Sequence, residues 1–122
     1  MGITNAILRV KEHRKSEKIA EVNFLVDSRA IYSLVPGLIL DQLEIEPYKE
    51  MSFSLADRTV LKRVCSAYFE FEGEGGPAPV VYGEEGDEPL LGATTLKSLG
   101  LVLNPFTRTL HPMRMLMAKL KS

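Results

Sequence analysis

The residues with the clearest chemical potential follow a very apolar stretch in the first third of the chain. Asp27 comes directly after residues 24–26, Phe-Leu-Val, and is followed by Ser28 and Arg29. A carboxyl group at the end of an apolar strand is partly removed from water, which raises its pKa and suits it to act as a general acid or base. An Asp at a strand end is also a common turn or cap residue, and on these residues alone both interpretations stay open.

The other reactive side chains form no comparable group. Cys65 lies on the apolar face of a predicted strand, and no histidine has a spacing that pairs with it, so we interpret it as a small core residue. Together with His13 and His111, it cannot supply the ligands of a structural zinc site. The sequence therefore predicts no metal and no cofactor.

Alternating apolar residues predict the strands that would position Asp27. In residues 18–27, Ala20, Val22, Phe24 and Val26 share one face, so residues 3–10 and 18–27 are predicted to form a hairpin. The charged connection at 11–17 is interpreted as a solvated turn, with a basic patch for an acidic partner as the alternative.

A second, longer hairpin is predicted over residues 51–72. Its arms alternate with period two, and its polar turn consists of Ala56, Asp57, Arg58 and Thr59. Short helices are predicted after Pro36-Gly37 and over residues 93–99, where Gly100 suits the helix end.

The rest of the second half is predicted to consist of short strands and loops. Glycine and proline at 73–77 predict a break, followed by a short strand at 80–82 and an acidic loop at 83–89. We interpret that loop as solvated, with selection of basic substrates as the alternative. Strands at 101–103 and 107–110 close the domain.

Length, composition and charge limit the classes of function. A chain of 122 residues with 45% hydrophobic residues fits one globular domain, residues 1–122. The net charge of −1 and the acidic clusters argue against a nucleic-acid partner. The apolar runs are too short for a membrane span, and the first residues carry no secretory signal, so we expect a cytoplasmic protein without a membrane partner.

Two segments in order along the chain resemble a known family. Residues 24–36, an apolar strand followed by Asp27-Ser28-Arg29-Ala30 and then Ser33, resemble the active-site segment of the retropepsin-like aspartic peptidases. Leu90-Leu91-Gly92, leading into a predicted helix, resembles the second signature of that family, and the 51–72 hairpin stands where the family has its flap. The resemblance covers residues 18–112 and implies an all-β, closed retropepsin-like barrel with one or two short helices, one lobe per chain.

The resemblance also implies an activity and a partner. Two carboxyl groups can hydrolyse a peptide bond when one activates water and the other, protonated, donates to the carbonyl oxygen. The chain holds one such motif, so the second Asp27 must come from another copy, and a homodimeric aspartic endopeptidase is implied. Family roles would place Ser28 across the dimer axis, Arg29 and Ala30 beside the substrate, and Ala56 to Thr59 over it. The apolar tail from Met113 to Leu120 is expected to join the dimer contact.

Arg29 departs from the family pattern, which has Gly at this position. A bulky cation there should lower the pKa of Asp27 and oppose the proton that an Asp pair shares. One outcome is a dimer that binds extended peptides without cleaving them. The other is that Arg29 turns outward or holds a substrate carboxylate and activity survives. A third interpretation is an unrelated small β-barrel with a structural Asp27.

Overall fold

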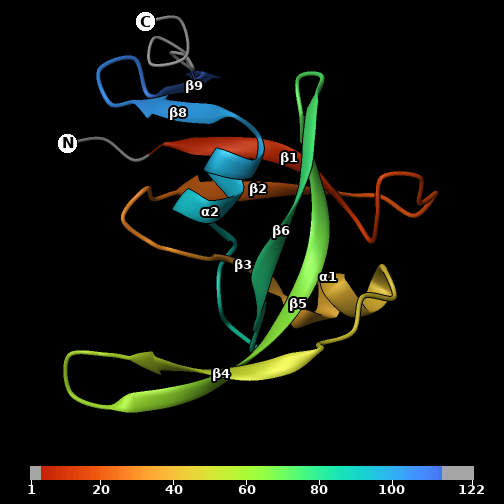
Figure 1. Ribbon diagram of the computed structural model, residues 1–122, viewed down its shortest axis with the longest axis vertical. Coiled ribbons are helices and arrows are strands. Elements are labelled where there is room, and N and C mark those ends of the chain that lie inside the picture. The colour runs from red at the N-terminus through yellow and green to blue at the C-terminus, as the bar shows by residue number, and fades with distance from the viewer. Residues whose placement is uncertain (1–3, 114–122) are drawn as a thin grey trace, which may run out of the picture.

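Strands dominate the computed structural model of the chain, which describes residues 4–113 (Figure 1). The strands are β1 (Asn5–Lys11), β2 (Ala20–Val26), β3 (Ser33–Pro36), β4 (Lys49–Ser54), β5 (Thr59–Phe71), β6 (Glu74–Gly83), β7 (Leu90–Leu91), β8 (Leu101–Asn104) and β9 (Thr109–Pro112). The helices in this part of the chain are α1 (Gly37–Gln42) and α2 (Ala93–Ser98). The predicted mostly-β class with short helices is confirmed.

The strands form a seven-stranded sheet in the order β1-β2-β7-β3-β6-β5-β4, and β8 pairs with β9 in a separate two-stranded sheet. β1 also pairs with β5, so the succession of paired strands returns to β1 and leaves β4 at an outer edge. Two of the pairings are parallel, β2 with β7 and β3 with β6. The short β7 therefore lies between β2 and β3, which follow each other in the chain.

The core lies among these strands and the two helices. Phe24 of β2 and Phe69 of β5 are fully buried, and their ring centroids are 6.0 Å apart. The burial of such large apolar side chains is the main favourable contribution to folding. The other core side chains with almost no exposed surface include Leu8, Val10, Val35, Leu40, Val64, Cys65, Val80 and Leu91.

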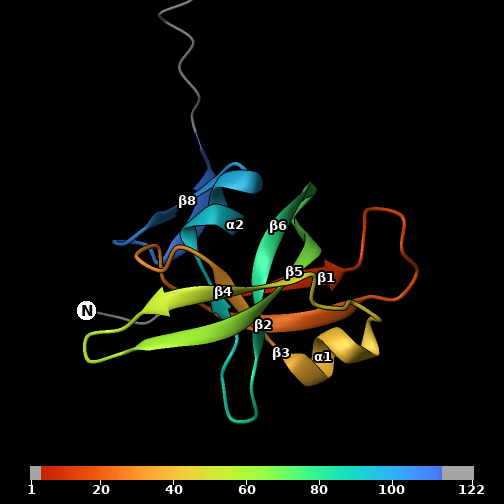
Figure 2. The same ribbon diagram turned by 60° about the horizontal axis from the view of Figure 1, so that its bottom comes forward.

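Both predicted hairpins are confirmed. β1 and β2 pair antiparallel with Ala6 opposite Phe24, and β4 and β5 pair antiparallel with Phe53 opposite Val60. The β4–β5 hairpin projects beyond the rest of the sheet in both views of the ribbon (Figures 1 and 2). Only the second half of β5, from Val64 onward, enters the core.

The predicted break at residues 73–77 is wrong, because β6 already begins at Glu74. Glu72 and Gly73 have φ angles of 48° and 87°, which suit a tight two-residue hairpin turn between Phe71 and Glu74. Gly76 lies within the strand because α2 packs on it, and a Cβ there would come within 2.6 Å of Ser98 Oγ. Glycine at this position permits a close approach instead of ending the strand.

Two further predictions concern a membrane span and the C-terminal tail. No helix among the described residues is long and apolar enough to cross a membrane. Residues 114–120, which make up most of the tail assigned to the dimer contact, lie outside the described residues.

Candidate active site

Backbone hydrogen bonds fix Asp27 at the end of β2. The N–H of Asp27 donates to the carbonyl oxygen of Leu91 at 3.0 Å, which extends the parallel pairing of β2 with β7. The N–H of Ala30 donates to the carbonyl oxygen of Asp27 at 3.1 Å and closes a turn. The structure thus brings together the two sequence segments that carried the family resemblance.

The start of α2 holds the loop that follows Asp27. The N–H groups of Ala93 and Thr94 donate to the carbonyl oxygens of Ala30 and Ile31, at 2.7 and 3.0 Å. A Cβ at Gly92 would lie 2.6 Å from the carbonyl oxygen of Tyr32, which is too close for any side chain. Gly92 is therefore required by the approach of two backbone segments, not by an unusual φ angle.

A buried pair of hydroxyl groups completes this support, and the sequence analysis assigned neither of them this role. Ser33 Oγ lies 2.5 Å from Thr95 Oγ1 and accepts a hydrogen bond of 2.9 Å from the N–H of Gly92. Both side chains are fully buried. Ser33 belongs to the segment that carries the family resemblance, but Thr95 stands out only as a hydroxyl residue in a predicted helix, and their separation of 62 positions conceals the contact.

Arg29 contacts Asp27 twice. Its backbone N–H donates to Asp27 Oδ1 at 3.0 Å, and its Nε lies 3.3 Å from the same oxygen. The backbone hydrogen bond lowers the pKa of Asp27 more than burial raises it, and the guanidinium lowers it further. The expectation that an apolar environment raises this pKa is wrong for the single chain, because the Asp27 side chain is 31% exposed and bonded to Arg29.

A cleft lies between the β4–β5 hairpin and the loop of residues 27–32, called the Asp27 loop below. Tyr32 and Phe53 meet across it edge to face, with ring centroids 5.9 Å apart. The cleft has a volume of about 530 Å³. It is lined by Arg29, Ala30, Ile31, Tyr32, Leu34, Phe53, Leu55, Arg58, Val60, Lys62, Val81 and Leu90.

The predicted site residues divide into two groups. Arg29, Ala30 and Arg58 line the cleft. The lining does not include Asp27, the predicted catalytic residue, and it also lacks four predicted substrate-binding residues, Ser28 and, from the hairpin turn, Ala56, Asp57 and Thr59. All four of these residues are exposed. The turn is closed by the N–H of Leu55, which donates to the carbonyl oxygen of Arg58 at 2.7 Å.

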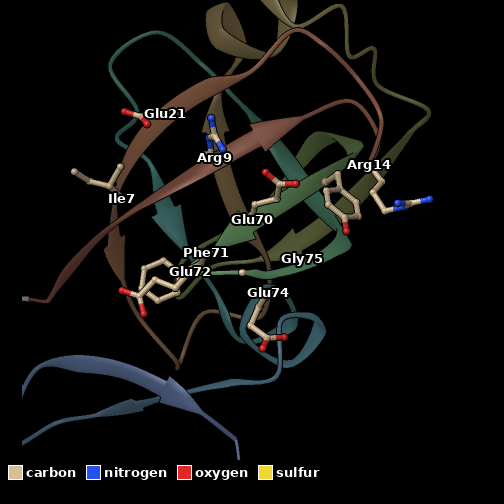
Figure 3. A pocket seen from close by; sticks show the side chains of 11 residues that line it. Ile7, Arg9, Arg14, Glu21, Glu70, Phe71, Glu72, Glu74 and Gly75 are labelled. Carbon is tan, nitrogen blue, oxygen red and sulfur yellow. The ribbon is translucent and has the colours of Figure 1, made fainter.

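A larger pocket, of about 720 Å³, lies away from Asp27 between β1 and the β5–β6 turn (Figure 3). Arg9 and Arg14 line it beside Glu70, Glu72 and Glu74, and none of the predicted site residues belongs to it. It lies apart from the predicted site residues and its lining mixes cations with carboxylates, so size alone does not make it the candidate site.

The other candidates for chemistry were the Cys65 thiol and a metal site. Burial raises the pKa of the Cys65 thiol to about 11, so the thiol stays protonated and Cys65 is confirmed as a core residue. Within residues 4–113, no three His, Cys, Asp or Glu side chains gather in a way that could hold a metal ion.

No protein-family model and no curated protein matches the chain, but solved structures do. The solution structure of simian foamy virus (mac) protease is 18% identical, with a TM-score of 0.53, and the match covers 75% of this chain and 92% of that one. The foamy viral protease-reverse transcriptase in complex with an RNA/DNA hybrid is 18% identical, with a TM-score of 0.54, over 93% of this chain and 13% of that one. The native prototype foamy virus protease-reverse transcriptase is 17% identical, with a TM-score of 0.52, over 93% and 12%.

At these identities the likeness shows the fold alone. The chain has a retropepsin-like fold, which confirms the coarse form of the predicted architecture and argues against an unrelated barrel. The two protease-reverse transcriptase chains are far longer than this one, which corresponds to only 13% and 12% of their length.

We expect Ser33→Ala to destabilise the fold more than Thr95→Val. The first change leaves both Thr95 Oγ1 and the N–H of Gly92 without their partner, at a cost of about 2 kcal/mol, whereas the second leaves the Gly92 bond intact and costs about 1 kcal/mol. Urea unfolding measures both, with Ser54→Ala, an exposed serine on β4, as control. Equal losses in the two buried variants would contradict this view of Ser33.

We expect Asp27 to titrate below the usual Asp value of about 3.9 in the monomeric chain. Because the folded pKa lies below the unfolded one, the stability that Asp27 contributes is present above the unfolded pKa and is lost as the pH falls through the folded value. NMR of the carboxyl carbon at monomeric concentrations measures the pKa. Arg29→Gln should raise it only in part, because the backbone N–H remains, and a value above 3.9 in the unaltered monomer would contradict the expectation.

Proposed function

We propose that the chain is one half of a homodimeric aspartic endopeptidase, in which Asp27 of two copies form the reacting pair. The observation that carries this proposal is Asp27 itself, held by β7 at the end of β2 and adjoining the loop that lines an apolar cleft, in a retropepsin-like fold. The described chain offers one such carboxyl group, so the second must come from a second copy related by two-fold symmetry. We include in the proposal that the paired strands of each copy form one closed barrel.

The reaction needs two protonation states in one pair. One Asp27 carboxylate removes a proton from a water molecule, which attacks the peptide carbonyl carbon, while the protonated Asp27 of the other copy donates to the carbonyl oxygen. Two adjacent carboxyl groups favour this state because their like charges resist ionising together.

The remaining site residues act in substrate binding. Arg29 and Ala30 adjoin the substrate in the cleft, and Ser28 links the two Asp27 loops across the dimer axis. The turn of residues 56–59 moves over the bound peptide and excludes water, as the projecting β4–β5 hairpin allows. The apolar cleft walls take the side chains of an extended substrate.

A second candidate function has its own observation, the contact between Arg29 and Asp27. A guanidinium 3.3 Å from the carboxylate favours its ionised form and so removes the protonated partner that the reaction needs. With both Asp27 groups ionised, the same dimer would bind an extended peptide as an added strand and leave it intact.

The proposal requires a dimer and an Asp27-dependent reaction. We expect sedimentation equilibrium at micromolar concentration to show a species of twice the 13.6 kDa chain mass. Asp27→Asn should abolish the cleavage of an unfolded protein without dissociating the dimer, because the amide can neither activate water nor share a proton. A purely monomeric chain, or activity that persists in Asp27→Asn after contaminating proteases are excluded, would refute the proposal.

Arg29→Gly distinguishes the two candidate functions. Removal of the guanidinium frees Asp27 to share a proton, so we expect peptidase activity to rise from little or none to a clearly measurable rate, most strongly at mildly acidic pH. Equal activity in both forms would show that Arg29 does not restrain the pair. No activity in either form of an intact dimer would favour peptide binding.

A further inference from the structure

The cleft beside the β4–β5 hairpin combines apolar walls with charges of one sign. Its uncharged lining is dominated by large apolar and aromatic side chains, and two of them, Ile31 and Leu55, are 68% and 47% exposed. Exposed apolar side chains in a concave site favour a ligand that covers them. The walls therefore suit an apolar side chain of a bound peptide.

All the charged residues that line the cleft are cationic. They are Arg29 from the Asp27 loop, Arg58 from the hairpin turn and Lys62 from β5. Two of them belong to the β4–β5 hairpin and the third to the loop after β2, and no carboxylate belongs to the lining. The Lys62 side chain is only 27% exposed, so much of its length packs against its surroundings.

The carboxylates that these cations contact hold them loosely. Arg29 Nε lies 3.3 Å from Asp27, Arg58 Nη1 lies 3.5 Å from Asp57, and Lys62 Nζ lies 3.6 Å from Glu84. Strong charge-assisted hydrogen bonds are shorter, roughly 2.7–2.9 Å. Each of these long pairs has at least one largely exposed partner and contributes little to stability, so a carboxylate inside the cleft can compete for these cations.

We propose that this cleft selects peptides in which an acidic side chain adjoins an apolar one. The apolar side chain packs in the cleft against its apolar lining, which includes the contacting rings of Tyr32 and Phe53, and the carboxylate pairs with Arg58 and Lys62, with Arg29 available as a third cation. The selectivity rests on the proposed function, because it assigns the substrate class of the same cleft. A basic side chain at the same place would meet like charge and be excluded.

The acidic loop of residues 84–88 offers the opposite selectivity. Glu84, Glu85 and Asp87 line a different pocket, beside α1, together with Arg63. Asp87 is already used inside this loop, where its Oδ2 accepts a hydrogen bond from the N–H of Glu84 at 2.8 Å. Preference for basic peptides is therefore the alternative that the experiment must separate.

Binding of labelled peptides tests the selectivity without requiring cleavage. Three short peptides share one apolar core and carry Glu, Gln or Lys beside it, and fluorescence anisotropy measures the affinity of each for the unaltered protein. We expect the Glu peptide to bind roughly tenfold more tightly than the Lys peptide, because the three cations that line the cleft attract a carboxylate and repel an ammonium group. The difference should shrink in about 1 M salt, where the screening length falls to about 3 Å.

Variants locate the effect. Lys62→Gln and Arg58→Gln should each weaken the Glu peptide roughly threefold and leave the Gln peptide unchanged, because only a carboxylate uses these charges. Arg14→Gln removes a comparable exposed positive charge from the pocket between β1 and the β5–β6 turn. It serves as the matched control, with no expected effect on any peptide.

Each result decides between the proposals. Equal affinities for the Glu and Lys peptides, a preference for Lys, or no binding of any peptide would overturn the selectivity. Selective binding without any hydrolysis in the wild type or Arg29→Gly would support the selectivity and refute the peptidase. Hydrolysis of unfolded protein without a preference for acidic side chains would support the peptidase and refute the selectivity.

Discussion

The close approach of two backbone segments at Gly92 is the constraint on which the site depends. The turn after β2 and the segment that enters α2 are joined by hydrogen bonds from Asp27 to Leu91 and from Ala93 to Ala30. They approach so closely that no Cβ fits at Gly92. The buried pair of Ser33 and Thr95 supplies hydrogen-bond partners at the same place. Ser33 Oγ accepts the hydrogen bond from the N–H of Gly92, which would be costly to bury without an acceptor. Asp27 is thus positioned by main-chain atoms and by the buried side chains of Ser33 and Thr95.

This mode of support explains why the fold accommodates Arg29. The bonds that hold the Asp27 loop do not use the side chain at position 29, and that side chain is 91% exposed. Arg29 is also not among the non-glycine residues with positive φ, so its backbone conformation is open to any residue. Glycine at this position is therefore dispensable for folding here. The substitution changes the electrostatics of Asp27 and the occupancy of the cleft, and leaves the architecture intact.

The local parts of this structure could be predicted from residue patterns and the coarse architecture from the family resemblance, whereas the individual long-range contacts could not. Alternation in residues 20–26 and 51–71 identified both hairpins, because the strand period of two is a local property. Gly75 and Gly76 misled because the reason for them, the packing of Tyr68 and Ser98 on β6, lies elsewhere in the chain. The contact of Ser33 with Thr95 was hidden for the same reason. The pKa of Asp27 was predicted to be raised because the sequence showed the apolar strand before it. The sequence did not show that the backbone N–H of Arg29 donates to its carboxylate, which lowers the pKa.

Arg29 links catalysis and recognition in opposite senses. Its backbone N–H and, to a smaller extent, its guanidinium stabilise the ionised form of Asp27, which would weaken the general acid that the proposed peptide hydrolysis requires. The same cation belongs to the rim of the cleft, where it adds to the attraction that Arg58 and Lys62 exert on a carboxylate. A ligand carboxylate that pairs with the Arg29 guanidinium would draw it from Asp27 and relieve part of the restraint on the proton, because the hydrogen bond from the backbone N–H of Arg29 remains. In the proposed dimer, an acidic peptide in the cleft would therefore ease, without removing, the restraint that Arg29 places on a proton shared by two Asp27 groups.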